Sequence, residues 1–387
     1  MRLLDAASVT HGEGLPNLIE FNSTTIPPYA ILSHTWGENE IQCTDLKNAD
    51  VRERASFWKI RCACTQALHD GYKFVWIDTC SIDKSSSAEL SEAIQSMFQW
   101  YERAEICYTY LENAPIQIDT AAAELHFAQH RWFTRGWTLQ ELLAPREMVF
   151  LTDGPDFPTE AGSDWVELGT KKSLSGLIRS ATGIDVKFLL KQRPIDSASI
   201  AKRMSWASHR ETTRPEDMAY SLMGIFSVNM PLLYGEGSCK AFLRLQGEIM
   251  KQSDDQSIFA WYDPEALPGS RHGLLAASPS LFKNSGGISS NADRKHQTFS
   301  MTNQGLQIDL QLFQVWGNIF TAVVDCLGPF PAGDSSCFCV LLEQLGGRNF
   351  RRFAHVAANA PLKTWRRISG WNEIFVSQIV NEPFPRN

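Results

Sequence analysis

Four short runs of apolar, β-branched and aromatic residues occur in the first 151 residues of this 387-residue chain. They cover residues 29–33, 74–78, 106–111 and 148–151. Continuous apolar runs of this length are typical of strands that are buried on both faces of a parallel sheet. Helical patterns fill the gaps between the first three runs. This alternation of strand and helix predicts an α/β fold, in which a parallel sheet carries helices on both faces.

Two pairs of polar residues predict where the intervening helices begin. Asp50 with Glu53, and Ser86 with Glu89, fit the capping box, in which two side chains bond to free backbone N–H groups at a helix start. Apolar residues at helical spacing follow each pair, and Gly71 marks the end of the first helix. We therefore expect helices that begin at these two pairs.

Polar and aromatic residues directly follow the first two predicted strands. Open α/β sheets bind ligands beyond the carboxyl ends of their strands, so these residues are expected at one edge of the sheet. For each residue alone a structural role is the simpler alternative, such as a turn at Gly37 or a capped loop at Asp78. The candidate binding residues are Ser33, His34, Trp36 and Gly37 after the first strand, and Asp78, Asp83 and Lys84 after the second.

A third segment, residues 131–143, reads RWFTRGWTLQELL. Trp137 and Glu141 are four residues apart, so they share one face of a helix, and Arg131 and Arg135 lie just before them. An aromatic surface beside a single carboxylate suits a sugar or an electron-poor heterocycle. The same pattern is also typical of one turn of a buried helix, because large aromatic side chains are usually buried.

These segments together resemble the HET (heterokaryon incompatibility) domain of filamentous fungi. The resemblance rests on LSHTWG at 32–37, WIDTCSIDKSSSAELSEAIQSMFQWY at 76–101 and RWFTRGWTLQELLAP at 131–145, and a similar later block covers 203–237. In all it spans about residues 29 to 261. It implies an intracellular protein of self/non-self recognition whose activation leads to growth arrest or cell death.

HET domains in turn resemble TIR domains, which have a flavodoxin-like fold and whose enzymatic members cleave NAD. Those members carry a Trp-Cys-x-x-Glu motif in which the Glu is catalytic. Trp137 and Glu141 have the same spacing, with Thr138 in the place of the Cys. The resemblance implies a TIR-like sheet, Glu141 as the catalytic residue, and NAD as a substrate with no further cofactor required.

The chemistry of that reaction is consistent with a single carboxylate. Cleavage of the nicotinamide–ribose bond passes through a sugar with oxocarbenium character, as in glycoside hydrolysis. Nicotinamide leaves as a neutral ring, so Glu141 alone would suffice to orient the ribose and stabilise its positive charge. Trp137 would pack on a ring, and Arg131 or Arg135 would pair with the pyrophosphate.

The remainder of the chain predicts a helical region followed by strands. Gly and Pro residues in 152–172 predict a linker or loop. Helical patterns then cover residues 200–209, 213–226 and 237–251, with Thr213 as the cap of the second. Period-two alternation at 306–312 and 320–326, and apolar runs at 338–342 and 374–380, predict antiparallel strands.

We therefore expect three parts in the chain. They are an α/β core at 1–151, a helical continuation at 152–261 and a smaller antiparallel β domain at 262–387. No catalytic pattern is visible in the last part, for which interaction or regulation is the default expectation.

Composition limits the class of protein. The start MRLLDAASV lacks the apolar core of a signal peptide, and no window approaches the ~18 consecutive apolar residues that span a membrane. The nine cysteines lack zinc spacing and are typical of reduced thiols in the cytoplasm. A net charge of −7 without a basic run argues against nucleic acid. We expect a cytoplasmic protein with no membrane or nucleic-acid partner.

Two hypotheses of different class remain. In the first, the α/β region is an enzyme that hydrolyses NAD when assembled. In the second, it is a non-catalytic module that signals death by self-association, through the exposed face of the helix at 87–103, on a signal from an unidentified protein partner. A small-molecule site without turnover is a third alternative. A pocket that contains Glu141 would favour the enzyme, and a Glu141 buried in an ion pair would favour the module.

Overall fold

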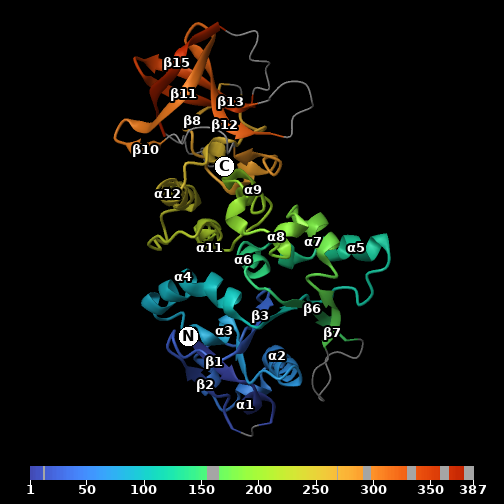
Figure 1. The fold of residues 1–387 in the computed structure, drawn as a ribbon. Helices are drawn as coiled ribbons and strands as arrows, with labels where there is room; N and C mark the ends of the chain where they lie inside the picture. The colour runs from blue at the N-terminus through green and yellow to red at the C-terminus, as the bar shows by residue number, and fades with distance from the viewer. Residues whose placement is uncertain are drawn as a thin grey trace. The chain divides into compact units, whose positions relative to one another are not determined.

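A computed structural model describes residues 1–11, 14–154, 165–267, 269–290, 298–328, 337–357 and 366–378. The chain forms two compact units, of which the first contains Met1–Pro194 and Arg210–Thr212 and the second contains Ile195–His209 and Thr213–Asn387. Figure 1 shows the α/β layers of the first unit and the strand-rich end of the second. The boundaries expected at residues 151 and 261 stay predictions.

The first unit is built on a seven-stranded sheet in the order β2-β1-β4-β3-β5-β6-β7. The four central strands, β4, β3, β5 and β6, run parallel, which confirms the four predicted strands. The strands at both edges pair antiparallel, so the sheet is mixed and not purely parallel. The bounds are β1 Arg2–Asp5, β2 Leu18–Glu20, β3 Tyr29–His34, β4 Phe74–Trp76, β5 Ile106–Tyr110, β6 Met148–Asp153 and β7 Trp165–Thr170.

The linker expected at 152–172 is wrong in its described parts. β6 continues to Asp153 and β7 covers Trp165–Thr170, where the two strands pair from Val149 opposite Thr170 to Asp153 opposite Trp165. Residues 155–164, which include two of the prolines behind that expectation, lie outside the described residues. The Gly and Pro residues predicted a loop, and the strand β7 that follows them was therefore not predicted.

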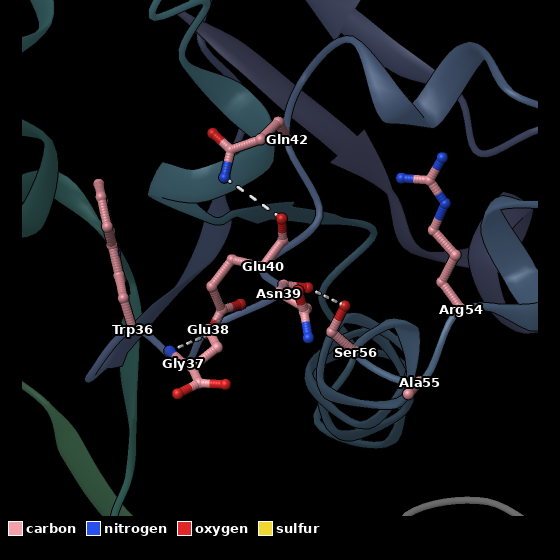
Figure 2. Close-up of a pocket in the computed structure, with 9 residues that line it drawn as sticks. All are labelled: Trp36, Gly37, Glu38, Asn39, Glu40, Gln42, Arg54, Ala55 and Ser56. Atoms are coloured by element: carbon pink, nitrogen blue, oxygen red, sulfur yellow. Dashed lines mark hydrogen bonds between the residues drawn. The ribbon is translucent and has the colours of Figure 1, made fainter.

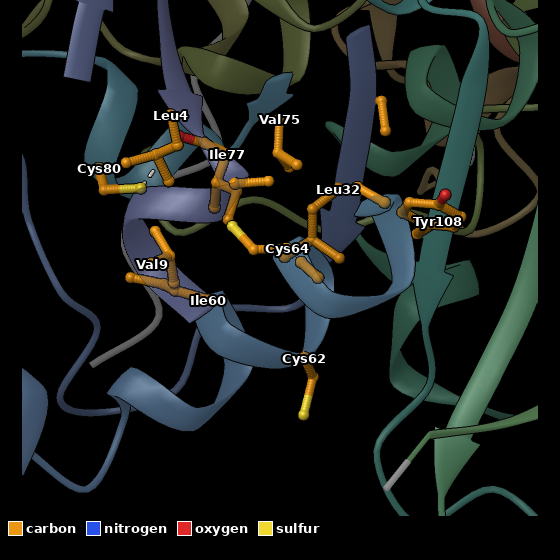
Figure 3. Packing of buried hydrophobic residues seen from close by; sticks show 14 of the residues in the cluster. Leu4, Val9, Leu32, Ile60, Cys62, Cys64, Val75, Ile77, Cys80 and Tyr108 are labelled. Atoms are coloured by element: carbon orange, nitrogen blue, oxygen red, sulfur yellow. Dashed lines mark hydrogen bonds between the residues drawn. The ribbon is translucent and has the colours of Figure 1, made fainter. Parts of the chain in front are cut away.

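Helices cover both faces of this sheet, as the sequence predicts. On one face α1 and α2 pack against the sheet through Val9, Ile60 and Cys64, which meet Leu32 and Val75 in one buried cluster (Figure 3). On the other face the ring of Tyr101 in α4 lies 5.8 Å from that of Trp76. The bounds are α1 Ala6–Thr10, α2 Phe57–His69, α3 Asp78–Ser81, α4 Ser87–Arg103, α5 Ala121–Ala128, α6 Thr138–Leu143, α7 Ser175–Thr182 and α8 Val186–Leu189.

One of the two predicted helix starts is confirmed and the other is wrong. Ser86 accepts a hydrogen bond from the backbone N–H of Glu89 at the start of α4. Asp50 makes no capping bond, and the segment after it is a single 3-10 turn, Val51–Glu53. The Asp50 carboxylate lies 3.6 Å from the Arg54 guanidinium instead. The helix α2 begins only at Phe57.

The second unit contains α9 Ile200–Ser205, α10 Asp217–Tyr220, α11 Met223–Phe226 and α12 Ser238–Met250. The helices expected near 200 and over 237–251 are confirmed, although the first is shorter than expected. The single helix expected from Thr213 to Phe226 is wrong, since a turn separates α10 from α11. The side-chain carboxylate of Glu216, just before α10, accepts from the backbone N–H groups of Gly235 and Gly237, both at 2.9 Å.

The strands of the second unit close on themselves. β11, β15, β14, β13 and β12 pair in sequence, and β12 also pairs with β11, so five strands form a ring. All these pairs are antiparallel except β14 with β15. The bounds are β8 Arg271–His272, β9 Ser289–Ser290, β10 Phe299–Thr302, β11 Gly305–Trp316, β12 Ile319–Leu327, β13 Cys337–Gly346, β14 Asn349–Ala357 and β15 Arg366–Val376.

The predicted strands of this unit are confirmed, except that the last one ends at Val376 and residues 379–380 of its expected range lie outside the described residues. β14 was not predicted, because charged residues interrupt its apolar pattern. One of them, Arg352, is completely buried, donates to the carbonyl of Phe259 at 2.9 Å and lies 3.8 Å from the centre of the Trp261 ring. From the sequence alone, an arginine is expected at the surface, so this buried position could not be predicted.

Candidate functional site

The carboxyl ends of β3 and β4 meet at one edge of the sheet, as topology requires. Ser33 and His34 are the last two residues of β3, and Asp78 opens α3 just after β4. The imidazole Nδ1 of His34 lies 3.9 Å from Oδ1 of Asp78. The two loops that follow these strands are therefore neighbours in the fold.

Glu141 lies behind this edge, in the interior of the first unit. It is the fourth residue of the six-residue helix α6 and only 6% exposed. Its Oε2 accepts a hydrogen bond from the Ser33 hydroxyl at 2.5 Å. The Ser33 oxygen in turn accepts from the indole N–H of Trp132 at 2.8 Å. Trp132, Ser33 and Glu141 therefore form a buried row of hydrogen bonds, the Glu141 row.

Burial decides the protonation of Glu141. Loss of solvent raises the pKa of this carboxyl to about 8, and the nearby charge of Asp78 adds to the rise. The hydrogen bonds of Ser33 and Tyr101 and the charge of Arg210 act in the opposite direction but are smaller. At neutral pH the buried carboxyl is therefore mostly protonated, because burial disfavours its charged form.

Side chains form hydrogen bonds at both ends of α6. At the start, the Thr138 hydroxyl donates to the carbonyls of Trp132 and Arg135, and Arg210 donates to that hydroxyl at 2.9 Å. At the end, the Lys171 ammonium donates to the carbonyls of Leu142 at 3.0 Å and Pro145 at 2.5 Å. A helix this short leaves most of its backbone groups without intrahelical partners, so such bonds determine where Glu141 lies.

The structure separates the arginines and tryptophans of the 131–143 segment. Arg131 is exposed and donates to the carbonyl of Trp36 at 3.4 Å. Trp137 is half-buried at the start of α6, and its carbonyl accepts from the N–H of Glu141 at 3.4 Å. Arg135 is half-buried and its backbone pairs with Glu211. The indole that bonds to Ser33, next to Glu141, is that of Trp132, which was not among the predicted site residues.

Trp36 connects the two loops. Its indole N–H donates to Oδ2 of Asp78 at 2.7 Å, and the Lys84 ammonium lies 3.6 Å from the centre of its ring. Burial lowers the pKa of Lys84, against the opposing charges of Asp78, Cys80 and Glu40. Asp83, by contrast, bonds locally to the N–H and hydroxyl of Ser85. The structure therefore joins Trp36, Asp78 and Lys84, and it leaves Asp83 in its own turn.

Glu40 belongs to the same cluster and was not singled out from the sequence. Its Oε1 accepts from the Lys59 ammonium at 2.5 Å and from the Gly37 N–H at 2.8 Å, while its Oε2 lies 3.7 Å from Nε2 of His34. Burial would raise the pKa of Glu40, but His34, Lys59 and the Gly37 N–H together hold it well below its usual range. No sequence pattern marks this residue, since Lys59 is nineteen positions away on α2.

A surface pocket of about 680 Å³ opens beside Trp36 and Glu40 (Figure 2). Its walls come from the loop after β3 and from the residues just before and at the start of α2. Glu141 does not line it. The lining residues are Trp36, Gly37, Glu38, Asn39, Glu40, Gln42, Arg54, Ala55 and Ser56.

Three other features of the described residues bear on the class of site. No group of three or more His, Cys, Asp or Glu side chains in the described ranges has an arrangement that would hold a metal ion. The free thiols are those of Cys43, Cys62, Cys64, Cys80, Cys107, Cys239, Cys326 and Cys339. In the part of the chain that the structure covers, every helix is too short or too polar to cross a lipid bilayer.

Comparison with known proteins identifies the family. Residues 29–123 match the family described as heterokaryon incompatibility protein (HET). Over 291 residues, or 72% of its length, the chain is 42% identical to the vegetative incompatibility protein HET-E-1 of Podospora anserina. The chain is a member of the HET family. The residues of the HET match contain β3, β4 and β5 and the whole Trp36 pocket.

The other comparisons set the limits of this HET assignment. Residues 240–315 match a domain of unknown function, DUF8212. The chain spans about a fifth (20%) of the length of HET-E-1. No solved structure matches the chain. The likeness of the HET sheet to TIR domains therefore stays a prediction.

Proposed function

We propose that this chain acts in heterokaryon incompatibility, as a self/non-self recognition and cell-death effector whose α/β unit hydrolyses the nicotinamide–ribose bond of NAD when assembled. The observation that carries the enzymatic part is Glu141, a single carboxyl beside the carboxyl ends of parallel strands, hydrogen-bonded to Ser33. The name of the HET family and that of the Podospora protein support the biological part.

In this proposal Glu141 orients the ribose and stabilises the positive charge that develops on it. The bond between the ribose and the nicotinamide nitrogen breaks, and its electron pair leaves with the ring. Water then adds to the ribose and releases one proton. Ser33 is a positioning residue, because its hydroxyl fixes the direction of the Glu141 carboxyl. Arg131, Arg135 and Trp137 would contact the rest of the substrate.

The burial of Glu141 implies that the described fold is a resting state. The carboxyl is 6% exposed and burial keeps its pKa near 8, so substrate and water reach it only after a rearrangement. In the assembled state a wetter environment would lower that pKa and produce the carboxylate that the reaction needs. Activity should therefore depend on clustering.

The test is NAD consumption by the purified chain, fused to an inducible dimeriser, with and without clustering. Glu141→Gln keeps the shape of the side chain and removes its ionisation. Glu147→Gln is the matched control, because that carboxylate is exposed in the same segment. Release of nicotinamide by the clustered wild type and the control, but not by Glu141→Gln, supports the enzyme. Equal activity of all three variants places the chemistry elsewhere.

A second candidate, a non-catalytic assembly module, is favoured by the inaccessibility of Glu141. The pocket described above does not include this residue. The exposed positions of α4, which include Glu92, Gln95, Gln99 and Glu102, would form the interface. If Glu141→Gln retains cell-killing activity while Glu92→Lys loses both killing and self-association, the module replaces the enzyme.

A further inference from the structure

We propose that the pocket beside Trp36 binds a flat, positively charged heteroaromatic ring of the pyridinium class, stacked on the indole face that lines the pocket. The nicotinamide ring of oxidised NAD is such a cation, so this site would serve the proposed function. The biological meaning of the site rests on that function, but the binding of the ring does not. Trp36 would then be a binding residue for the ring, separate from Glu141.

The pocket has the size and shape for a ring. Its volume of about 680 Å³ lies in the range of small-molecule sites. Trp36 is 47% exposed, which is high for a tryptophan, and it stands at one side of the pocket with Arg54 at the other (Figure 2). A large aromatic surface held at the wall of a pocket is a suitable platform for stacking.

The neighbours of Trp36 make its ring attractive to a cation. The indole N–H donates to the Asp78 carboxylate at 2.7 Å, which increases the electron density of the ring. The Lys84 ammonium already lies 3.6 Å from the ring centre. Lys84 is not among the residues that line the pocket. The ring therefore already makes one cation–π contact, and Trp36 remains 47% exposed for a second.

The walls of the pocket add negative charge. The guanidinium of Arg54 is already paired with Asp45 at 2.8 Å and with Asp50 at 3.6 Å. Lys59 offsets the charge of Glu40. Glu38 is exposed and has no ion pair among the described residues, so it gives the lining its net negative charge.

One acceptor in the wall would recognise a substituent on the ring. Oε1 of Glu40 is occupied by Lys59 and Gly37, but its Oε2 lies 3.7 Å from His34, which is longer than a hydrogen bond. Among the described residues, Oε2 has only this longer contact with His34. A ring that carries a carboxamide would donate an N–H to it, so we expect a preference for pyridinium carboxamides.

The test measures binding and not turnover. The probes are the 1-methylnicotinamide cation and neutral nicotinamide, titrated into the full chain to about 10 mM, since fragments of this size bind weakly. The readout is the indole N–H signal of Trp36 in an ¹⁵N-correlated spectrum. We expect the cation to bind about tenfold more tightly than the neutral ring, the difference that a cation–π contact and one charge supply.

Variants connect the binding to the pocket. Trp36→Ala should remove binding, as measured by calorimetry, and Glu38→Gln should reduce the preference for the cation without affecting the fold. Trp316→Ala is the matched control, because that tryptophan is 77% exposed in the other unit. Equal affinity for both probes, no binding of either probe, or binding that survives Trp36→Ala would overturn the inference. Cation binding without NAD turnover would overturn the proposed function and leave this inference standing.

Discussion

The Ser33 hydroxyl lies between Glu141 and Trp132, donating to the carboxyl at 2.5 Å and accepting from the indole N–H at 2.8 Å. All three side chains are buried. The hydroxyl bonds to both partners at once. Its removal would therefore leave the buried Trp132 N–H without its acceptor and the buried Glu141 carboxyl without its donor.

Ser33→Ala should destabilise the first unit by about 1–3 kcal/mol, since a buried N–H loses its acceptor. It should also raise the pKa of Glu141 further, because the Ser33 bond lowers it. Urea unfolding gives the first quantity and carboxyl ¹³C shifts give the second. Ser87→Ala, at an exposed position of α4, is the control. An unchanged unfolding midpoint would contradict the hydrogen-bonded row.

The raised pKa of Glu141 predicts a pH dependence of stability. Between the unfolded pKa near 4.5 and the folded value of about 8, the folded state binds the extra proton. The free energy of unfolding should therefore fall as pH rises through this window, by a few kcal/mol in order of magnitude. Glu141→Gln cannot release a proton and should show a shallower decline. Parallel curves from pH 5 to 8 would show that Glu141 titrates normally.

Lys171→Met should loosen α6. The buried ammonium is the bond partner of two carbonyls near the end of that helix, and its loss leaves them unsatisfied, at a cost of about 2–3 kcal/mol. Hydrogen exchange of the α6 amides should accelerate by more than that of α2. Lys172→Met changes the adjacent, exposed lysine and should have no such effect. Identical exchange in both variants would exclude a role for Lys171 in holding α6.

Arg352→Met should destabilise the second unit, and Arg352→Lys should not restore it. The guanidinium bonds to the carbonyls of Phe259 and Trp261 and stacks on the Trp261 ring, which a lysine cannot reproduce. We expect a loss of about 3–5 kcal/mol for either variant, of the size found for broken buried networks. Arg348→Lys, at an exposed position, is the control. Near-native thermal stability of Arg352→Lys would show that charge alone suffices.

The sequence predicted what is continuous along the chain. β3, β5 and β6 consist largely of apolar and aromatic residues, which predict strands, and the alternation with helices predicts a parallel sheet. β1 and β2 are four and three residues long, too short for a periodic signal, and they depend on pairing with each other and with β4. Asp50 was misread as a cap because its pairing with Arg54 is not visible in a capping pattern.

The site residues also divide into those that the sequence predicted and those that it did not. The joining of His34, Trp36 and Asp78 follows from strand order, because parallel strands bring their carboxyl ends to one edge. Glu40 bonds to Lys59 and Trp132 bonds to Ser33. These partners are distant in the sequence, so no local spacing predicts either contact. Trp137 drew attention because of its position in a motif, whereas the neighbouring Trp132 makes the buried bond.

The placement of β1 has a consequence for synthesis. This strand leaves the ribosome before the other strands of its sheet, yet it pairs on one side with β4, where Leu4 lies opposite Val75. Until residues 74–76 emerge, the strand has only the three residues of β2 as a partner. Leu3 and Leu4 therefore stay uncovered until the later strand β4 has been made. Translation speed across β3 and α2 should consequently influence how much of the nascent chain aggregates before the sheet closes.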